Sequence, residues 1–146
     1  MNDKYIVHFI SRTKQKMILY IQKQLKKEEL SNIVPSHGNI LTVLYENNGK
    51  LSLQEIAKKI GKDKSTVTSL VKKLISLGYV EKITSKEDKR VTYLHLTTKG
   101  KSIEDIFDKI SYNVQQTAYC NFTVEEKETF LRLLKKINQN FDSRNI

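Results

Sequence analysis

Residues Ser52–Gly100 read SLQEIAKKIGKDKSTVTSLVKKLISLGYVEKITSKEDKRVTYLHLTTKG and carry the most informative pattern in the chain. The stretch opens with the S-x-x-E form of a capping box at Ser52 and Glu55, in which each side chain can satisfy the other residue's free backbone N–H. Apolar residues then recur at helical spacing as far as Gly61, which tolerates the left-handed geometry of a helix end. The pattern therefore predicts a short helix, a tight turn and a second helix.

The second helix is predicted over about residues 63–77, with Asp63 or Ser65 as its cap. Its apolar residues repeat every three or four positions, so one face belongs to the core. The opposite arc groups short hydroxyl side chains with two cations, namely Ser65, Thr66, Thr68, Ser69, Lys72 and Lys73. Such side chains suit contacts with phosphates and with base edges in the major groove of DNA. An ordinary solvated helix face would have a similar composition.

After Gly78 the pattern becomes strand-like. A strand is expected through Ile83, and a second β-prone run covers residues 91–96. The charged tip between them, about residues 84–91, is predicted to be a wing. Arg90 could enter the minor groove or clasp backbone phosphates, with Asp88 orienting its guanidinium through a charge-assisted pair. The alternative is an exposed, charge-bearing turn that contributes little energetically.

Four further helices are predicted around these elements. Pro35 and Ser36 predict the start of a short helix, with Ser36 as its N-cap. An apolar stripe predicts a long helix over about residues 4–29, and Thr97 or Thr98 is expected to cap another long helix after the second strand. The capping box Thr123–Glu126 predicts the last helix.

The expected fold is mainly α with a small β-hairpin wing. A winged helix-turn-helix over residues 35–100 lies within a single domain, 1–146, and is flanked by long N- and C-terminal helices. The winged module is too small to cover the apolar stripes of these helices, so residues 1–34 and 101–146 are expected to form a two-fold dimer interface. A monomeric helical bundle is the alternative.

The charge of the chain is concentrated in the expected winged module. The formal net charge is +10, and residues 50–100 carry twelve Lys and Arg against five Asp and Glu. A basic surface attracts polyanions through counterion release. There is no apolar run long enough for a membrane span, no signal peptide is apparent, and the single cysteine, Cys120, supports no disulfide framework. A cytoplasmic protein that does not bind membranes is the expectation.

The sequence contains no pattern typical of catalysis or of cofactor binding. His8, His37 and His95 are scattered and no C-x-x-C is present, so no metal site is expected. Nucleotide-binding fingerprints are absent, and the helix hydroxyls have no neighbouring base that would activate them. We therefore expect neither an enzyme nor a cofactor.

Several of these segments together resemble the MarR-type winged-helix transcription factors. The resemblance rests on Leu53–Ala57, Lys64–Leu74 and Gly78–Val80. Its most specific part is Asp88-Lys89-Arg90 followed by Leu94–Gly100, which match the pattern D-x-R…L-x-L-T-x-x-G. The resemblance implies a homodimer whose recognition helices enter successive major grooves of a pseudo-palindromic operator in double-stranded DNA. It makes Ser65, Thr66 and Thr68 candidate base or phosphate contacts, Ser69, Lys72, Lys73 and Lys82 candidate phosphate contacts, and Arg90 the wing contact supported by Asp88.

The resemblance also implies a ligand-responsive regulator, usually a repressor, that releases DNA when a small aromatic or anionic effector alters the dimer. His37, near the junction of the winged module and the dimerisation helices, is the candidate effector contact, although capping or packing would also account for it. Cys120 does not lie in the N-terminal helix, where the related thiol-based peroxide sensors carry their cysteine, so redox sensing is not expected. A winged-helix adaptor that binds a protein partner without reading DNA is the alternative function.

Overall fold

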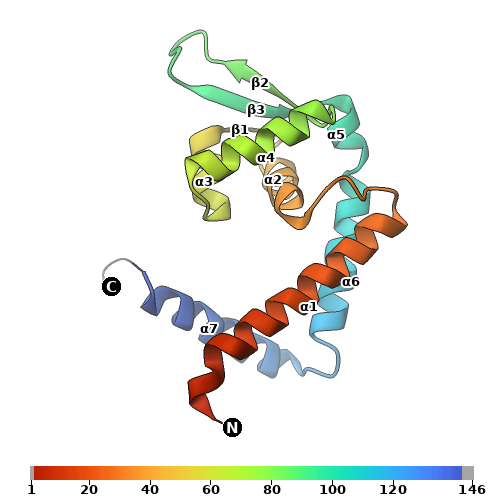
Figure 1. Cartoon of the computed structure of the whole chain (residues 1–146), viewed down its shortest axis with the longest axis vertical. Helices are drawn as coiled ribbons and strands as arrows, with labels where there is room; N and C mark the ends of the chain where they lie inside the picture. Colours follow the sequence, from red (N-terminus) through yellow and green to blue (C-terminus); the bar gives the residue numbers. More distant parts are fainter. Residues whose placement is uncertain (1, 143–146) are drawn as a thin grey trace. The chain divides into compact units, whose positions relative to one another are not determined.

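The computed structural model describes residues 2–142 (Figure 1). One compact unit ends at Ser111 and the other begins at Tyr112. The elements are η1 Asp3–Tyr5, α1 Ile6–Lys27, α2 Pro35–Tyr45, β1 Lys50–Ser52, α3 Leu53–Ile60, α4 Lys64–Ser76, β2 Val80–Thr84, β3 Thr92–Leu96, α5 Thr98–Ser102, α6 Glu104–Ala118 and α7 Val124–Asn140. The mainly helical fold with a winged helix-turn-helix and long flanking helices is therefore confirmed.

The wing belongs to a three-stranded antiparallel sheet with strand order β1-β3-β2. The hairpin β2–β3 was expected, whereas β1 was not, because its three residues overlap the start of the capping box and are too few to show strand alternation. Gly49, at φ 80°, turns the chain after α2. This turn brings Leu51 opposite Leu94 in the sheet, and both side chains are buried.

The core of the first unit lies between the sheet and helices α2, α3 and α4, with the β2–β3 hairpin projecting beyond the helices (Figure 1). The side chains at its centre are at most 1% exposed, and these are Ile40, Leu41, Leu44, Ile56, Val67, Val71, Leu74, Val80 and Leu94. Burying apolar surface is the main force that stabilises such a core. One face of α4 is therefore held by packing, and the opposite face is left to solvent.

Local capping explains where the helices of the module begin and end. The Ser52 hydroxyl accepts the Glu55 N–H at 3.1 Å, and the Glu55 carboxylate accepts the Ser52 N–H at 2.8 Å, which confirms the predicted capping box. Gly61 ends α3 in the left-handed region at φ 66°. Of the two expected caps of α4, Asp63 is the one used.

Two predictions about helix ends are wrong. Ser36 is not an N-cap, because α2 already begins at Pro35, whose fixed φ and missing N–H suit the first helical position. The single long helix expected after β3 is divided into α5, capped by Thr97, and α6. Ile103 interrupts the helix at φ −103°, ψ 6°, and its side chain is buried. Helical spacing alone does not reveal such a local interruption.

Outside this core, both units expose apolar side chains. On η1 and α1, Tyr5, Ile6, Val7, Phe9, Ile10, Met17 and Leu19 are each at least 40% exposed. In the second unit the rings of Tyr119, Phe122 and Phe130 make edge-to-face contacts, yet no residue of α7 is buried. Over the described residues, no helix combines the length and apolar character that crossing a membrane requires.

Candidate nucleic-acid interface

Helix α4 presents the hydroxyl and lysine side chains that the sequence singled out. Ser65, Ser69, Lys72 and Lys73 are exposed, while Thr66 and Thr68 are half-buried at the margins of the face. The two lysines make no ion pair within residues 2–142, so their charge is not neutralised by a neighbouring carboxylate. The structure thus brings six of the predicted residues together on one helix.

The first turn of α4 is organised around Asp63. One of its carboxylate oxygens accepts the Thr66 N–H at 2.7 Å and the Ser65 hydroxyl at 2.9 Å. These hydrogen bonds hold the pKa of Asp63 below its usual value. The largest effect comes from the Thr66 N–H, followed by the hydroxyls of Ser65 and Thr66. Because the cap stays ionised, it repels phosphates at this helix end and keeps the amide of Thr66 occupied.

The other hydroxyls on this face differ in their partners. The Thr68 hydroxyl donates to the backbone carbonyl of Lys64 at 2.8 Å. The Ser69 hydroxyl has no such bond in the described part of the chain, so its hydrogen is free for a partner outside the protein. Hydroxyl groups that look equivalent in the sequence therefore have different hydrogen-bonding capacity.

The C-terminal end of α4 is held by residues that follow β3. The Thr97 hydroxyl donates to the Gly78 carbonyl at 2.6 Å, and the Lys99 ammonium donates to the Leu77 carbonyl at 2.7 Å. A cation near the final carbonyls of a helix satisfies them and complements the helix dipole. The L-x-L-T-x-x-G segment thus orients the predicted recognition helix, a role that its spacing did not indicate.

The glycine of that segment is required by close packing. A Cβ atom placed on Gly100 would lie well inside van der Waals contact with the carbonyl oxygen of Tyr79. The Gly100 carbonyl in turn accepts the Tyr45 hydroxyl at 2.7 Å, and burial raises the pKa of Tyr45. Gly100 therefore permits α5 to approach the start of the wing.

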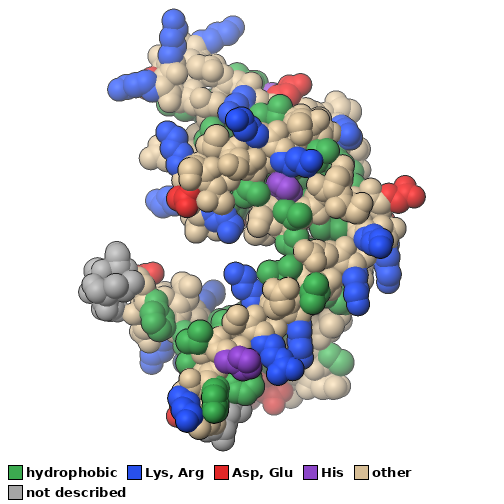
Figure 2. Space-filling model, viewed as in Figure 1, with side chains coloured by type: hydrophobic (Ala, Val, Ile, Leu, Met, Phe, Trp, Pro, Cys, Tyr) green, Lys and Arg blue, Asp and Glu red, His purple; other side chains and the backbone are tan. Residues whose placement is uncertain are grey.

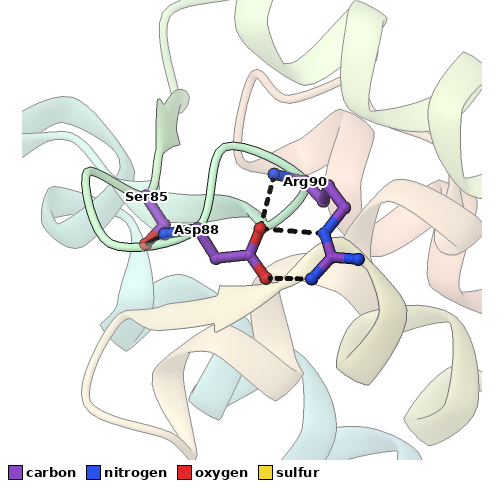
Figure 3. A network of polar contacts seen from close by, with 3 residues as sticks. All are labelled: Ser85, Asp88 and Arg90. Atoms are coloured by element: carbon purple, nitrogen blue, oxygen red, sulfur yellow. Dashed lines mark hydrogen bonds and ion pairs between the residues drawn. The ribbon is translucent and has the colours of Figure 1, made fainter.

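The wing carries the predicted pair of Asp88 and Arg90 (Figure 3). The guanidinium Nε and Nη2 atoms donate to the two carboxylate oxygens at 3.1 and 3.2 Å, and the Arg90 N–H donates to the same carboxylate at 3.0 Å. The bonds from Arg90 hold the pKa of Asp88 below its usual value. The Arg90 side chain is 90% exposed, so the pair adds little to stability and mainly directs the guanidinium.

The charges of the wing extend beyond this pair. Figure 2 shows Lys and Arg side chains gathered at the hairpin tip. Lys82 is exposed on β2. On the sheet face formed with the unpredicted strand β1, the Lys50 ammonium lies 4.5 Å from the centre of the Tyr93 ring. These positions give the module a basic outer surface.

The same sheet face holds a histidine. His95 lies between Lys50 and Glu81 in the register of the three strands. Its Nε2 atom is 3.3 Å from a Glu81 carboxylate oxygen, which is within ion-pair distance, but the geometry makes no hydrogen bond. We regard the two groups as neighbours rather than as a bonded pair.

His37 is buried at 7% exposure and acts as a local cap. Its Nδ1 atom accepts the Val34 N–H at 3.1 Å, which requires that nitrogen to be unprotonated. Burial, and then the nearby charge of Lys73, lower the pKa of His37. The geometry assigns His37 a structural role, and its contact with an effector stays a prediction.

Within residues 2–142, no group of three or more His, Cys, Asp or Glu side chains is arranged to hold a metal ion. Cys120 is exposed in the turn between α6 and α7, where it forms no disulfide.

Comparison with known proteins identifies the same region. A family model described as "MarR family" matches residues 31–91. The uncharacterized HTH-type transcriptional regulator YybA of Bacillus subtilis is 30% identical over 102 residues, which cover 70% of this chain and 67% of YybA. The HTH-type transcriptional regulator SarZ of Staphylococcus epidermidis is 30% identical over 106 residues, covering 72% of this chain and 70% of SarZ.

Among solved structures, a mutant MarR from E. coli complexed with operator DNA superposes with a TM-score of 0.80 at 25% identity. The match covers 90% of this chain and 92% of that protein. The likeness thus extends beyond the winged module to the flanking helices.

Proposed function

The chain belongs to the MarR family of winged helix-turn-helix transcriptional regulators, and from this premise we propose that it is a homodimeric, ligand-responsive repressor that binds operator DNA. The family consists of regulators and not of enzymes, so the expectation that the chain is no enzyme is confirmed.

The observation that carries the proposal is the combination of α4 and the wing on one basic module. The exposed face of α4 offers hydroxyls and the ammonium groups of Lys72 and Lys73, which form no ion pair with any described residue. The wing offers Arg90, with three of its five N–H groups left free by Asp88. We place α4 in the major groove, the wing at the minor groove or the backbone, and Lys82 at a phosphate.

Dimerisation is supported by the apolar side chains that each unit leaves exposed. Val7 on α1 and Val124 on α7 are 76% and 75% exposed, and a single chain offers them no cover. A second copy would bury these surfaces by two-fold symmetry. The two recognition helices would then face half-sites roughly 34–36 Å apart, which requires a pseudo-palindromic operator.

Release of DNA by a small aromatic or anionic effector is the regulatory part of the proposal. It is supported by membership of the family and by the position of His37 at the start of α2, where Lys73 of α4 is close enough to affect its titration. A ligand that moves the start of α2 would also move the exposed face of α4.

The proposal is tested by measuring the affinity of the purified protein for duplexes from its own upstream region across a salt series. A specific regulator prefers one fragment over an unrelated duplex by at least about 10³-fold at physiological salt, and its affinity falls steeply as salt rises. Equal affinity for all duplexes, or a flat salt response, would contradict the proposal. If a protein partner binds equally well when Lys72, Lys73 and Arg90 are changed to alanine, and no duplex binds at all, the adaptor function replaces it.

A further inference from the structure

We propose that Ser65 and Thr68 read hydrogen-bond donors on base edges, the amino groups of adenine or cytosine, and that neither hydroxyl contacts a phosphate. This inference rests on the proposed function and specifies what the exposed face of α4 recognises. It follows from where the hydroxyl hydrogens of the two residues already point.

The direction of both hydrogen bonds is determined by the partner atoms. The oxygen that Ser65 contacts belongs to Asp63, whose bonds to the first turn of α4 keep its carboxyl group ionised, and a carboxylate can only accept. The oxygen that Thr68 contacts, at 2.8 Å, is the backbone carbonyl of Lys64, which also can only accept. Each hydroxyl must therefore supply its own hydrogen to the protein.

A hydroxyl that has donated its hydrogen can only accept a further bond. Phosphate oxygens, guanine N7 and O6, adenine N7 and thymine O4 are all acceptors and do not match. In the major groove the donors are the N6 amino group of adenine and the N4 amino group of cytosine. Because Ser65 and Thr68 are three residues apart on one helix, they lie side by side and can face neighbouring bases.

The bond from Thr68 to the Lys64 carbonyl also restrains the side-chain rotamer, and so the direction of its methyl group. A threonine methyl packs favourably against the C5-methyl of thymine. An adenine paired with thymine offers both features within one base pair, so we expect Thr68 to face an A·T pair.

Ser69 provides a control within the same helix. Its hydroxyl is exposed and makes no hydrogen bond among the described residues, so it can donate to a phosphate. Lys72, three residues further on, adds a cation that has no ion pair in the described part of the chain. The serines at 65 and 69 thus have opposite roles, although each is an exposed serine on the same helix.

The test begins with duplexes selected by the wild-type protein from a random pool. Within the selected half-site, each adenine is replaced in turn by purine, which lacks the N6 amino group, and each cytosine by pyrimidin-2-one, which lacks the N4 amino group. At one position the replacement should weaken binding by the wild-type protein about 2- to 10-fold, the effect of one hydrogen bond. The same replacement should have little effect on Thr68→Val, in which the methyl group stays and a second methyl of similar volume replaces the hydroxyl. A neighbouring position should behave likewise with Ser65→Ala, whereas Ser69→Ala should weaken every duplex alike.

The outcomes separate the inference from the function on which it rests. Failure to select any site would overturn the proposed function. The inference alone would be overturned if Ser65→Ala or Thr68→Val changed the effect of replacing guanine by 7-deazaguanine, which lacks the N7 acceptor, and not the effect of a base that lacks an amino group. It would also be overturned if neither variant changed the effect of a base replacement at any position. The base substitutions on wild-type protein give a result even if a variant folds poorly.

Discussion

Replacing Arg90 with alanine tests whether the wing neutralises DNA phosphates. The side chain is 90% exposed and its only protein partner in the described residues is Asp88, so the change should leave the stability of the fold nearly unaltered. Each phosphate contact contributes about −0.9 to the slope of log K against log salt concentration. The effect of the substitution should therefore appear as a change in this slope.

The size of the change follows from the number of cations on the proposed interface. Lys72, Lys73, Lys82 and Arg90 of two protomers, with one phosphate each, give a slope of about −7. Removing Arg90 from both protomers changes it to about −5. Between 50 and 200 mM salt, the wild-type protein should lose about 10⁴-fold in affinity and the variant about 10³-fold.

Fluorescence anisotropy with a labelled operator over this salt range measures the slope directly. Arg12→Ala is the matched control, because it removes the same charge from α1, outside the winged module. If the slope for Arg90→Ala equals that of the wild-type protein, the wing makes no phosphate contact. An equal reduction for both variants would instead indicate a general effect of net charge.

Three further outcomes are expected. Asp88→Ala should weaken operator binding by about 2- to 10-fold per half-site in the same anisotropy assay, because Arg90 loses its orientation even though the chain gains positive charge; tighter binding would contradict this role. Gly100→Ala should lower the free energy of unfolding in urea by about 1–3 kcal/mol, since its Cβ would overlap the carbonyl of Tyr79. The lowered pKa of His37 means that below about pH 6.5 the unfolded chain binds a proton that the native state resists, so stability should fall as the pH is lowered from 7 to 5.5. Urea unfolding at the two pH values should show a smaller decrease for His37→Gln.

Features that depend on residues close along the chain could be predicted from the order of the amino acids. The capping boxes at Ser52 and Thr123 could be predicted because both partners lie within one helical turn. The same holds for the left-handed stop at Gly61 and for the pair of Asp88 and Arg90, which are two residues apart. Periodic apolar residues likewise predicted which face of α4 is buried and which is exposed.

Features that join distant segments became visible only in the folded molecule. Strand β1 exists because Leu51 packs opposite Leu94, and three residues alone carry no strand pattern. The end of α4 is held by Thr97 and Lys99, which approach it only after the hairpin has folded back. The physical reason is that spacing within the chain specifies the neighbours of a residue over a turn or two. Contacts between segments depend instead on how the packed core positions their backbones.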